Sequence, residues 1–433
     1  MKNHKSSILP SLVSFIVFIS VFNKTVYSTL SIVCMYATIL FLVLFIPRLS
    51  INKWDVLVLC LFYVVPFLWV VISAVHCFVM GSGFIAFVPT TIGRMANCCV
   101  YLCMYLAVRA SWQQGLVSTE SLLSAYSYGC IVLLVLGWWQ LAHYIFGIPF
   151  LDVETRNFIH SMDGNIGLGF RVTSIAEEPA YLIPYLIDLF IILFYKVAPP
   201  MTRKSRLRGM LLIGIMGLLL FTLSLSAYCN FAFIVLLVFV FMRRTKRKFL
   251  LGFLISLLAA LMVALVGDMI LAVLQRLNFQ DLMASNRLQE GYLPILHMLN
   301  DASPFTILLG YGAKGFDYIR QFVFYKTGWL TGQPIATTSH VIFIDFFVEY
   351  GLVGLGLIIT LFCILWYMAT SVYRCGGGRV AQLLVANLFI CSLYTADYAS
   401  PRFTIMLIFI ICMYLDRKRR ISHETILYRP PVV

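Results

Sequence analysis

The feature that most constrains this chain is a succession of apolar runs of roughly 17 to 25 residues. A helix rises about 1.5 Å per residue, so a run of this length matches a hydrocarbon layer of about 30 Å. The chain of 433 residues is 61% hydrophobic and 12% charged, whereas a soluble protein has about 25% charged residues. The pattern predicts an all-α integral membrane protein with about twelve transmembrane helices.

The apolar runs are expected to form one polytopic membrane domain over residues 1–433. The first run follows Lys2 and Lys5 as in a signal peptide, but no small-residue cleavage site follows it, so we interpret it as an uncleaved span. The predicted spans lie near residues 8–22, 29–47, 55–80, 94–109, 121–147, 174–198, 209–225, 227–242, 249–272, 340–371, 380–396 and 402–416.

Basic residues predict the orientation of these spans. Arg109, the runs at 203–208 and 243–248, and the tail at 417–420 lie on alternate connections. One side collects 22 of the 32 basic residues, and the positive-inside rule assigns that side to the cytoplasm. We therefore expect a bacterial inner-membrane protein with both termini in the cytoplasm. Each basic cluster adjoins an apolar span, which makes nucleic acid an unsuitable partner.

Two long connections lie on the opposite, periplasmic side, at 148–173 and 275–339. Loops of this length in a compact protein are usually functional. In the second loop, apolar residues recur at helical spacing and predict a helix along the membrane surface over 286–299. These residues are Leu288, Tyr292, Ile295, Leu296 and Leu299. The glycines that follow at 310–315 are expected to form turns, because no strand precedes them.

Charged side chains border these loops. Arg171 and Glu178 stand before a span, Arg287 begins the predicted surface helix, and His340 opens a span that also carries Glu349. Taken singly, each has an ordinary explanation, since an arginine can snorkel to head groups and a histidine can anchor a helix at the interface. Carboxylates inside a membrane are costly and often functional, but they can also serve only to bond neighbouring helices.

Two further acidic residues share this ambiguity. Asp345 lies four residues before Glu349 and so on the same helix face, and Asp188 lies within a span with no evident partner. The sequence has no Cys/His or carboxylate cluster with metal-ligand spacing and no phosphate-binding glycine motif of a soluble enzyme. Most of the twelve cysteines lie in apolar runs as small hydrophobes, so we expect no disulfide, no metal and no cofactor.

Five fragments in this order resemble the O-antigen ligase and O-antigen polymerase superfamily of membrane glycosyltransferases, over roughly residues 120 to 372. They are Arg171 with Glu178-Pro179, Leu223-Ser224-Leu225-Ser226, Arg287, the glycines of 310–315 with Phe316, and His340 with Glu349, Gly351 and Gly354. One departure is Ala227, where family members often carry an arginine.

The resemblance implies a helical bundle like that of GT-C glycosyltransferases, with short surface helices on a large periplasmic loop. It implies metal-independent, inverting transfer of undecaprenyl-diphosphate-linked glycan at the periplasmic face. Arg171 and Arg287 are the candidates for binding diphosphate, because guanidinium groups give bidentate bonds to phosphate oxygens. His340 is the candidate general base or diphosphate ligand, and Glu178 and Glu349 are secondary candidates that orient the acceptor or the arginines.

Several functions remain open on this evidence. A polymerase joins repeat units into a surface polysaccharide, whereas a ligase moves the finished chain to lipid A-core, and we favour the polymerase. A flippase or secondary transporter is the alternative from another class, and a scaffold in an envelope-assembly complex is a third. The expected partners are the lipid-linked glycan and membrane lipids, with a chain-length regulator as a further candidate.

Overall fold

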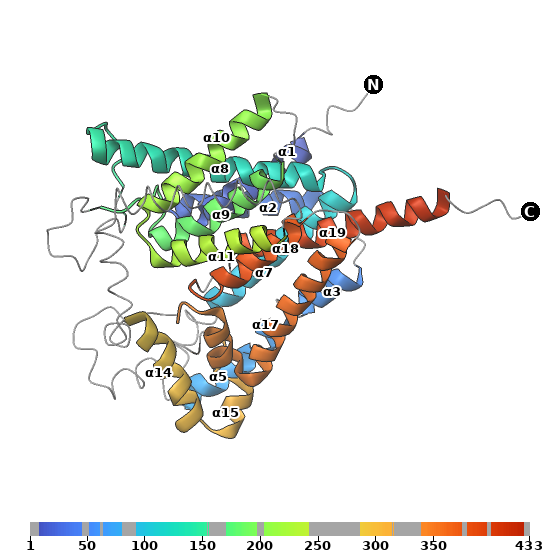
Figure 1. Ribbon diagram of the computed structural model, residues 1–433. Helices are drawn as coiled ribbons and strands as arrows, with labels where there is room; N and C mark the ends of the chain where they lie inside the picture. The colour runs from blue at the N-terminus through green and yellow to red at the C-terminus, as the bar shows by residue number, and fades with distance from the viewer. Residues whose placement is uncertain are drawn as a thin grey trace, which may run out of the picture.

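The computed structural model is helical (Figure 1). It describes residues 8–45, 52–60, 64–79, 92–153, 155, 170–196, 203–241, 286–313, 315, 339–374, 379–395 and 400–427. Within these residues the backbone is organised as helices and connections, with an isolated β-bridge between Thr25 and Ala176. The all-α prediction is therefore confirmed for the described part of the chain.

The helices follow the predicted apolar runs closely. The first half of the chain forms α1 (Ile8–Ile19), the 3-10 helix η2 (Ser20–Lys24), α2 (Ser28–Phe45), α3 (Lys53–Leu59), α4 (Val65–Leu68), α5 (Val70–Val79), α7 (Gly93–Gln113) and α8 (Thr119–Phe146). The second half forms α9 (Pro179–Lys196), α10 (Arg203–Phe221), α11 (Leu225–Phe241), α14 (Asn286–Asn300), α15 (Pro304–Leu309), α17 (Ile342–Arg374), α18 (Val380–Cys391) and α19 (Pro401–Leu427). The run predicted at 249–272 lies outside the described residues.

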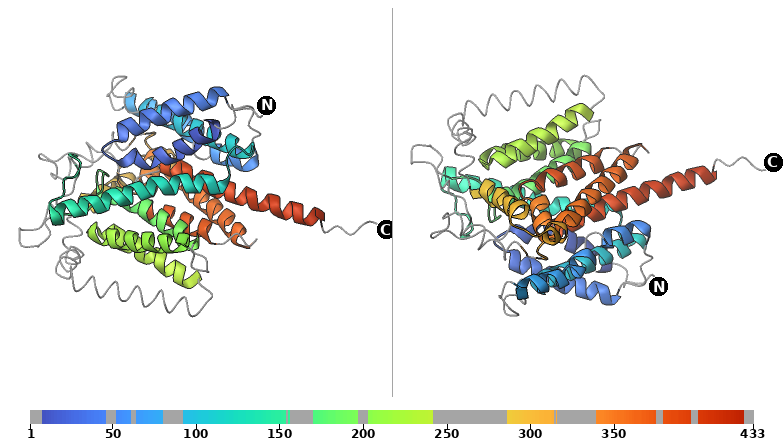
Figure 2. Two further views of the ribbon diagram at one scale, coloured as in Figure 1. Left: turned by 90° about the horizontal axis from the view of Figure 1, so that it is seen from above. Right: turned by 90° about the horizontal axis from the view of Figure 1, so that it is seen from below.

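The core is built around α9 and the first half of α19. Nearly every side chain from Leu182 to Leu193 is buried, as is every side chain from Pro401 to Cys412. A helix that is apolar and buried all round belongs at the centre of a bundle. The second half of α19 projects beyond the other helices (Figure 2), so the basic tail at 417–420 continues a helix.

Two helices are long and apolar enough to cross a membrane by themselves, α8 and α17. Shorter apolar helices occupy several other predicted runs, and large apolar side chains such as Leu30, Val71 and Met210 stay exposed on the outside. The chain is a helical membrane protein by these features, while the number of twelve spans stays a prediction.

Two predicted spans have different bounds in the structure. The run at 55–80 is divided among α3, α4 and α5. The run at 174–198 becomes helical only at Pro179, because Ser174 has a left-handed φ of 57° that a helix cannot contain. Residues 174–178 therefore form a turn before the helix.

Arg109 was counted above among basic residues on cytoplasmic connections, but its side chain is buried within α7. Its Nε donates to Asp55 Oδ1 at 3.0 Å and its Nη2 to Asp55 Oδ2 at 3.2 Å. The Tyr105 hydroxyl donates to the same carboxylate at 2.7 Å. A buried arginine is tolerated when a carboxylate pairs with it, and here Asp55 of α3 supplies that carboxylate. The position of Arg109 at the end of an apolar run does not reveal this partner.

Candidate functional site at one end of the bundle

The segment 171–178, which carries Arg171 and Glu178, is fastened to two other helices. Thr173 and Ser174 donate their backbone N–H groups to Gln140 Oε1 of α8 at 2.9 and 2.8 Å. Val172 N donates to Phe221 O at the end of α10, also at 2.8 Å. Arg171, which is half-buried, thereby lies next to the turn between α10 and α11.

Glu178 stands directly before α9 and is half-buried. Its carbonyl accepts from Tyr181 N at 3.0 Å, and Pro179 begins the helix, where its missing N–H has no cost. The neighbouring Glu177 donates its N–H to Lys24 O at 3.2 Å. The start of α9 thus lies beside the connection between η2 and α2.

The predicted Leu-Ser-x-Ser fragment forms the tight turn between α10 and α11. Leu223 adopts a left-handed φ of 46°, and the hydroxyls of Ser224 and Ser226 lie 2.8 Å apart. Ala227 is fully buried in the core. Packing therefore accounts for Ala227, and the arginine that the resemblance led us to expect near this turn has no counterpart at that position.

His340 precedes α17 in a left-handed conformation with a φ of 61°. The Asp345 carboxylate, 2% exposed, accepts from Ser339 N at 2.8 Å and from Ser339 Oγ at 2.6 Å. Val341 N donates back to Ser339 Oγ at 3.1 Å. Left-handed backbone costs a non-glycine residue about 1–3 kcal/mol and is retained where the surroundings enforce it. Asp345, in the first turn of α17, thus holds the turn at Ser339 and His340 that directly precedes this helix.

Three helices, α9, α17 and α18, are linked toward a common end of the bundle. Ile342 N, at the start of α17, donates to Ser392 O at the end of α18 at 2.9 Å. Asn387 of α18 in turn donates to Pro184 O of α9 at 3.3 Å. The starts of α9 and α17 therefore both lie toward the end of α18, and we call this region the His340 end.

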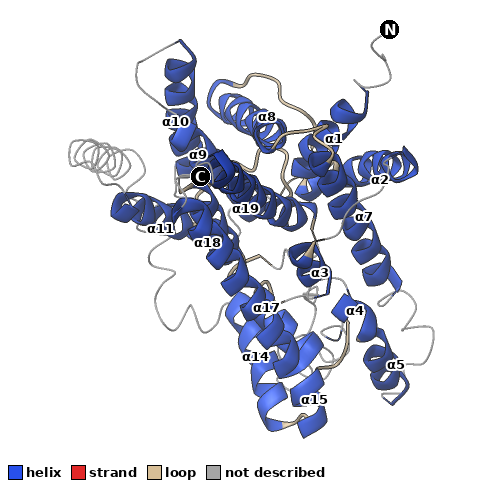
Figure 3. Ribbon diagram, turned by 90° about the vertical axis from the view of Figure 1, so that its right-hand side faces the viewer, coloured by secondary structure: helices blue, strands red, loops and turns tan. Residues whose placement is uncertain are grey.

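Arg287 reaches the same region by a different element. The helix predicted over 286–299 is confirmed as α14, while its place at a membrane surface stays a prediction. A Cβ on its Gly291 would lie 3.1 Å from Ile344 of α17. Met298 packs with Phe347 and Val348 further along, so α14 runs parallel to the first part of α17. Figure 3 shows α14 and α15 beside α17. Arg287, second residue of α14, therefore begins its helix near the level of His340, while its side chain is outside the described atoms.

The outer face of α14 agrees with a place at a membrane surface. Tyr292 is 49% exposed and Leu299 59% exposed, although both are apolar. The face that packs on the protein is formed instead by Gly291, Pro294 and Met298. Of the predicted apolar stripe, Tyr292 and Leu299 are thus exposed, whereas Ile295 and Leu296 are half-buried.

The glycines of 310–315 form turns, as predicted. Gly310 and Gly312 have φ angles of 74° and 91°. Tyr311 N donates to Val348 O at 2.9 Å, and Gly312 N to Glu349 O at 2.8 Å. A Cβ on Gly310 would lie 2.4 Å from the Glu349 carbonyl, so only glycine allows this approach.

The turn packs where α17 itself bends. Gly351 has a φ of 65°, and a Cβ there would lie 2.3 Å from Leu308 O. Glu349 is 3% exposed and follows the start of α17 by about 10 Å of helical rise. The structure therefore places Glu349 beside the glycine turn and well away from His340 along the helix, whereas Asp345 is the carboxylate tied to the His340 turn.

Sequence reasoning missed a polar group beneath the glycine turn. The Tyr311 hydroxyl lies 2.9 Å from His297 Nε2, and the His76 ring centroid lies 4.9 Å from that of Tyr311. His297 Nδ1 is 3.2 Å from Asp301 Oδ2. Burial raises the pKa of the Tyr311 hydroxyl above its ordinary value, and the Asp301 carboxylate raises it further. These effects favour the neutral hydroxyl. Residues 76 and 311 are too far apart in the sequence for any motif to have predicted their contact.

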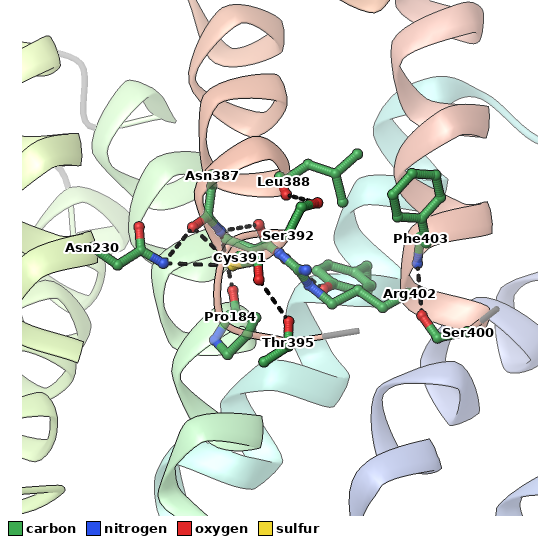
Figure 4. A network of polar contacts seen from close by, with 12 residues as sticks. Pro184, Asn230, Asn387, Leu388, Cys391, Ser392, Thr395, Ser400, Arg402 and Phe403 are labelled. Atoms are coloured by element: carbon green, nitrogen blue, oxygen red, sulfur yellow. Dashed lines mark hydrogen bonds and ion pairs between the residues drawn. The ribbon is translucent and has the colours of Figure 1, made fainter. Parts of the chain in front are cut away.

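Asp188 also has partners that its sequence did not reveal. Its carboxylate accepts from Arg402 Nε at 2.9 Å, Tyr126 Oη at 2.8 Å and Asn387 Nδ2 at 2.7 Å. Figure 4 shows the surrounding network, in which Asn230 of α11 also bonds Asn387. Asp188 joins α8, α9, α18 and α19 in the interior of the bundle, about 13 Å of helical rise past the start of α9.

Within the described residues, no group of three His, Cys, Asp or Glu side chains is arranged to hold a metal ion. The charged residues on the segments that lead to the His340 end are Arg171, Glu178, His340 and Asp345, and Arg402 lies deeper in the bundle. Such a set can bind an anion with arginines and move a proton at a histidine.

Residues 209–359 match the family model described as O-antigen ligase. The match confirms the resemblance to the O-antigen ligase and polymerase superfamily. It covers the Leu-Ser-x-Ser turn, α14, the glycine turn and the first part of α17, and it supports an O-antigen ligase or polymerase type of enzyme in general. No curated protein matches the chain.

Proposed function

We propose that the protein is a polymerase of undecaprenyl-diphosphate-linked repeat units, acting at the periplasmic face of the bacterial inner membrane by metal-independent, inverting glycosyl transfer. The observation that carries the proposal is that the Arg171 segment, the Leu-Ser-x-Ser turn and the His340 turn are each fastened to helices of the bundle by contacts between residues far apart in the sequence. Residues distant in the sequence, Val172 and Phe221 or Ile342 and Ser392, are joined by backbone hydrogen bonds.

The chemistry follows from these residue types. The acceptor hydroxyl attacks the anomeric carbon, loses its proton, and displaces the lipid diphosphate. Arg171 and Arg287 bind the diphosphate and stabilise the negative charge that develops on it. His340 takes the acceptor proton, and Ser339 with Asp345 holds its backbone. Glu178 orients the acceptor or the arginines, whereas Glu349, away from His340, holds the glycine turn through its backbone carbonyl.

The direct test is transfer by the purified protein in lipid vesicles with a lipid-linked repeat unit, with products separated by size. We expect a ladder of lengthening chains. Excess chelator should leave the ladder unchanged, since arginines replace a metal in this scheme. Loss of activity that Mg²⁺ or Mn²⁺ restores would contradict the metal-independent step.

Ligase activity is the second candidate, favoured by the description of the matched family. It requires the same charge stabilisation and differs in its acceptor. Adding lipid A-core to the same vesicles separates the two, because a ligase transfers glycan only to that acceptor. Absence of any covalent product in both reactions would instead favour a flippase or secondary transporter.

Conservative variants test the assigned roles. Lysine keeps the charge of Arg171 or Arg287 but lacks the planar fork, so transfer should fall below wild type, and alanine should cost roughly 10²–10³ in rate. His340→Gln can donate a hydrogen bond but cannot take a proton at neutral pH. Membrane abundance is measured for each variant. Near wild-type transfer in all three conservative variants would remove these residues from the mechanism.

A further inference from the structure

Arg402 is a buried arginine whose hydrogen-bonding capacity is mostly unused. It lies in the first turn of α19 and is 1% exposed. Its Nε donates to Asp188 at 2.9 Å, whereas Nη1 and Nη2 are both buried with no acceptor among the described residues. Its guanidinium lies 5.8 Å from the Tyr185 ring centroid, a contact that covers the face of the group and leaves its N–H bonds unsatisfied.

The hydrogen bonds leave one buried edge of the guanidinium without an acceptor among the described residues. Asp188 engages the Nε side, and its carboxylate is held in place by Tyr126 and Asn387. The opposite edge, formed by Nη1 and Nη2, is the one that binds two oxygens of a phosphate or carboxylate end-on. A buried donor without an acceptor is unfavourable, so this edge is suited to an anionic ligand.

The position of Arg402 connects it to the candidate site. Its partner Asp188 is on α9, the helix that follows the Arg171 segment. Asn387, which bonds Asp188, is little more than one turn from Ser392, which bonds the start of α17 beside His340. In Figure 4 the Arg402 side chain extends from α19 toward α18. Arg402 thus lies on the inner side of the His340 end.

We propose that Arg402 is a third anion-binding arginine of the transfer site, which bonds oxygens of the lipid diphosphate through Nη1 and Nη2, with Asp188 as the residue that positions it. The proposal rests on the function proposed above and adds a diphosphate-binding residue that the five sequence fragments did not contain. Arg171 precedes α9 and Arg287 begins α14, whereas Arg402 lies within the bundle, so the leaving group would be bound by residues of three separate elements.

Binding of undecaprenyl diphosphate to the full-length protein in nanodiscs tests the proposal. Undecaprenyl monophosphate and inorganic diphosphate are measured in parallel to separate a lipid diphosphate site from a general phosphate site. Arg402→Lys keeps the charge opposite Asp188 but loses the end-on pair, and we expect its affinity for undecaprenyl diphosphate to fall about 10- to 100-fold. Arg109→Lys, at an equally buried arginine far from the site, is the matched control and should bind like wild type.

A second variant guards against misfolding. Asp188→Asn with Arg402→Gln removes both charges together, leaves amides that can bond each other, and should show the same loss of affinity. Wild-type affinity in Arg402→Lys, or in the double variant if Arg402→Lys does not fold, would overturn the role of Arg402. If Arg171→Lys then still weakens binding, the proposed function stands without Arg402, whereas a wild-type protein that binds no diphosphate contradicts both.

Discussion

Two buried arginine–aspartate pairs lie near opposite ends of the bundle and are built differently. Arg109 forms two bonds to Asp55 and leaves a single nitrogen unpartnered among described residues. Arg402 forms one bond to Asp188 and leaves two. Both arginines are 1% exposed, so burial is the same and the difference lies in how many donors are used.

The surroundings of Arg109 form a closed network. Its guanidinium lies 4.6 Å from the Trp112 ring centroid, and Arg419 lies 4.5 Å from the same ring. Trp112 Nε1 donates to Thr119, and the Thr119 hydroxyl donates to Asp416 of α19 at 2.5 Å. Asp416 follows Arg402 by about 21 Å of helical rise, so α19 connects the two regions.

Backbone strain gathers at the other end. Ser174, Leu223 and His340 are the non-glycine residues with left-handed φ within the described chain, and each lies in a different fragment near the His340 end. Strained backbone is retained where surrounding contacts enforce it, and such positions cluster at functional sites. The end around Arg109 therefore stabilises the bundle. The His340 end has strained backbone and, nearby, an arginine with two donors unpartnered among the described residues.

The largest expected effect comes from breaking the Arg109 pair. Asp55→Leu leaves a buried guanidinium without its carboxylate and should lower the free energy of unfolding by about 3–5 kcal/mol. The double variant Asp55→Leu with Arg109→Met should recover most of that loss, because an apolar pair of similar volume is tolerated. Chemical unfolding in detergent measures both.

Binding of undecaprenyl diphosphate separates a loss of stability from a loss of function in these variants. The fraction of Asp55→Leu that stays folded should bind undecaprenyl diphosphate like wild type, since the pair is far from the His340 end. Asp188→Leu should lose stability and binding together. Equal loss of binding in the two variants would show that the ends are not functionally distinct.

The next effect compares two glycines with left-handed φ. Gly312→Ala places a Cβ 2.3 Å from Ser73 Oγ in addition to the backbone strain, so we expect a loss of about 2–4 kcal/mol. Gly115, on the connection after α7, has a φ of 73° and no heavy atom within 4 Å of a built Cβ. Gly115→Ala should therefore cost only about 1–2 kcal/mol. Similar losses in the two variants would mean that the glycine turn can move away from α5.

The smallest effect is expected at the turn that holds His340. Asp345→Ala removes the acceptor of two Ser339 donors and should cost about 1–2 kcal/mol in stability. Asp345→Asn keeps an oxygen acceptor and should restore most of the stability. If the turn positions His340, transfer should fall roughly 10-fold in alanine and much less in asparagine at equal substrate binding. An unchanged rate in Asp345→Ala would make the turn purely structural.

The sequence predicted the features that depend on residues close together along the chain. Apolar periodicity predicted the helices of the described chain because each span must satisfy its own backbone hydrogen bonds. The helix over 286–299 and the turns at 310–315 followed from spacing and from glycine, which tolerates positive φ at little steric cost. The family resemblance over the later fragments likewise depended on residues in order along the chain.

The pairing of charges was decided only by the tertiary structure. Nothing in the sequence spacing joins Asp55 to Arg109 or Asp188 to Arg402, because partners on different helices meet through packing between helices. The same packing put Asp345, rather than Glu349, at the His340 turn. The chain itself determined a bundle of apolar helices. The packing of α9, α18 and α19 determined which buried arginine kept two donors without an acceptor among the described residues.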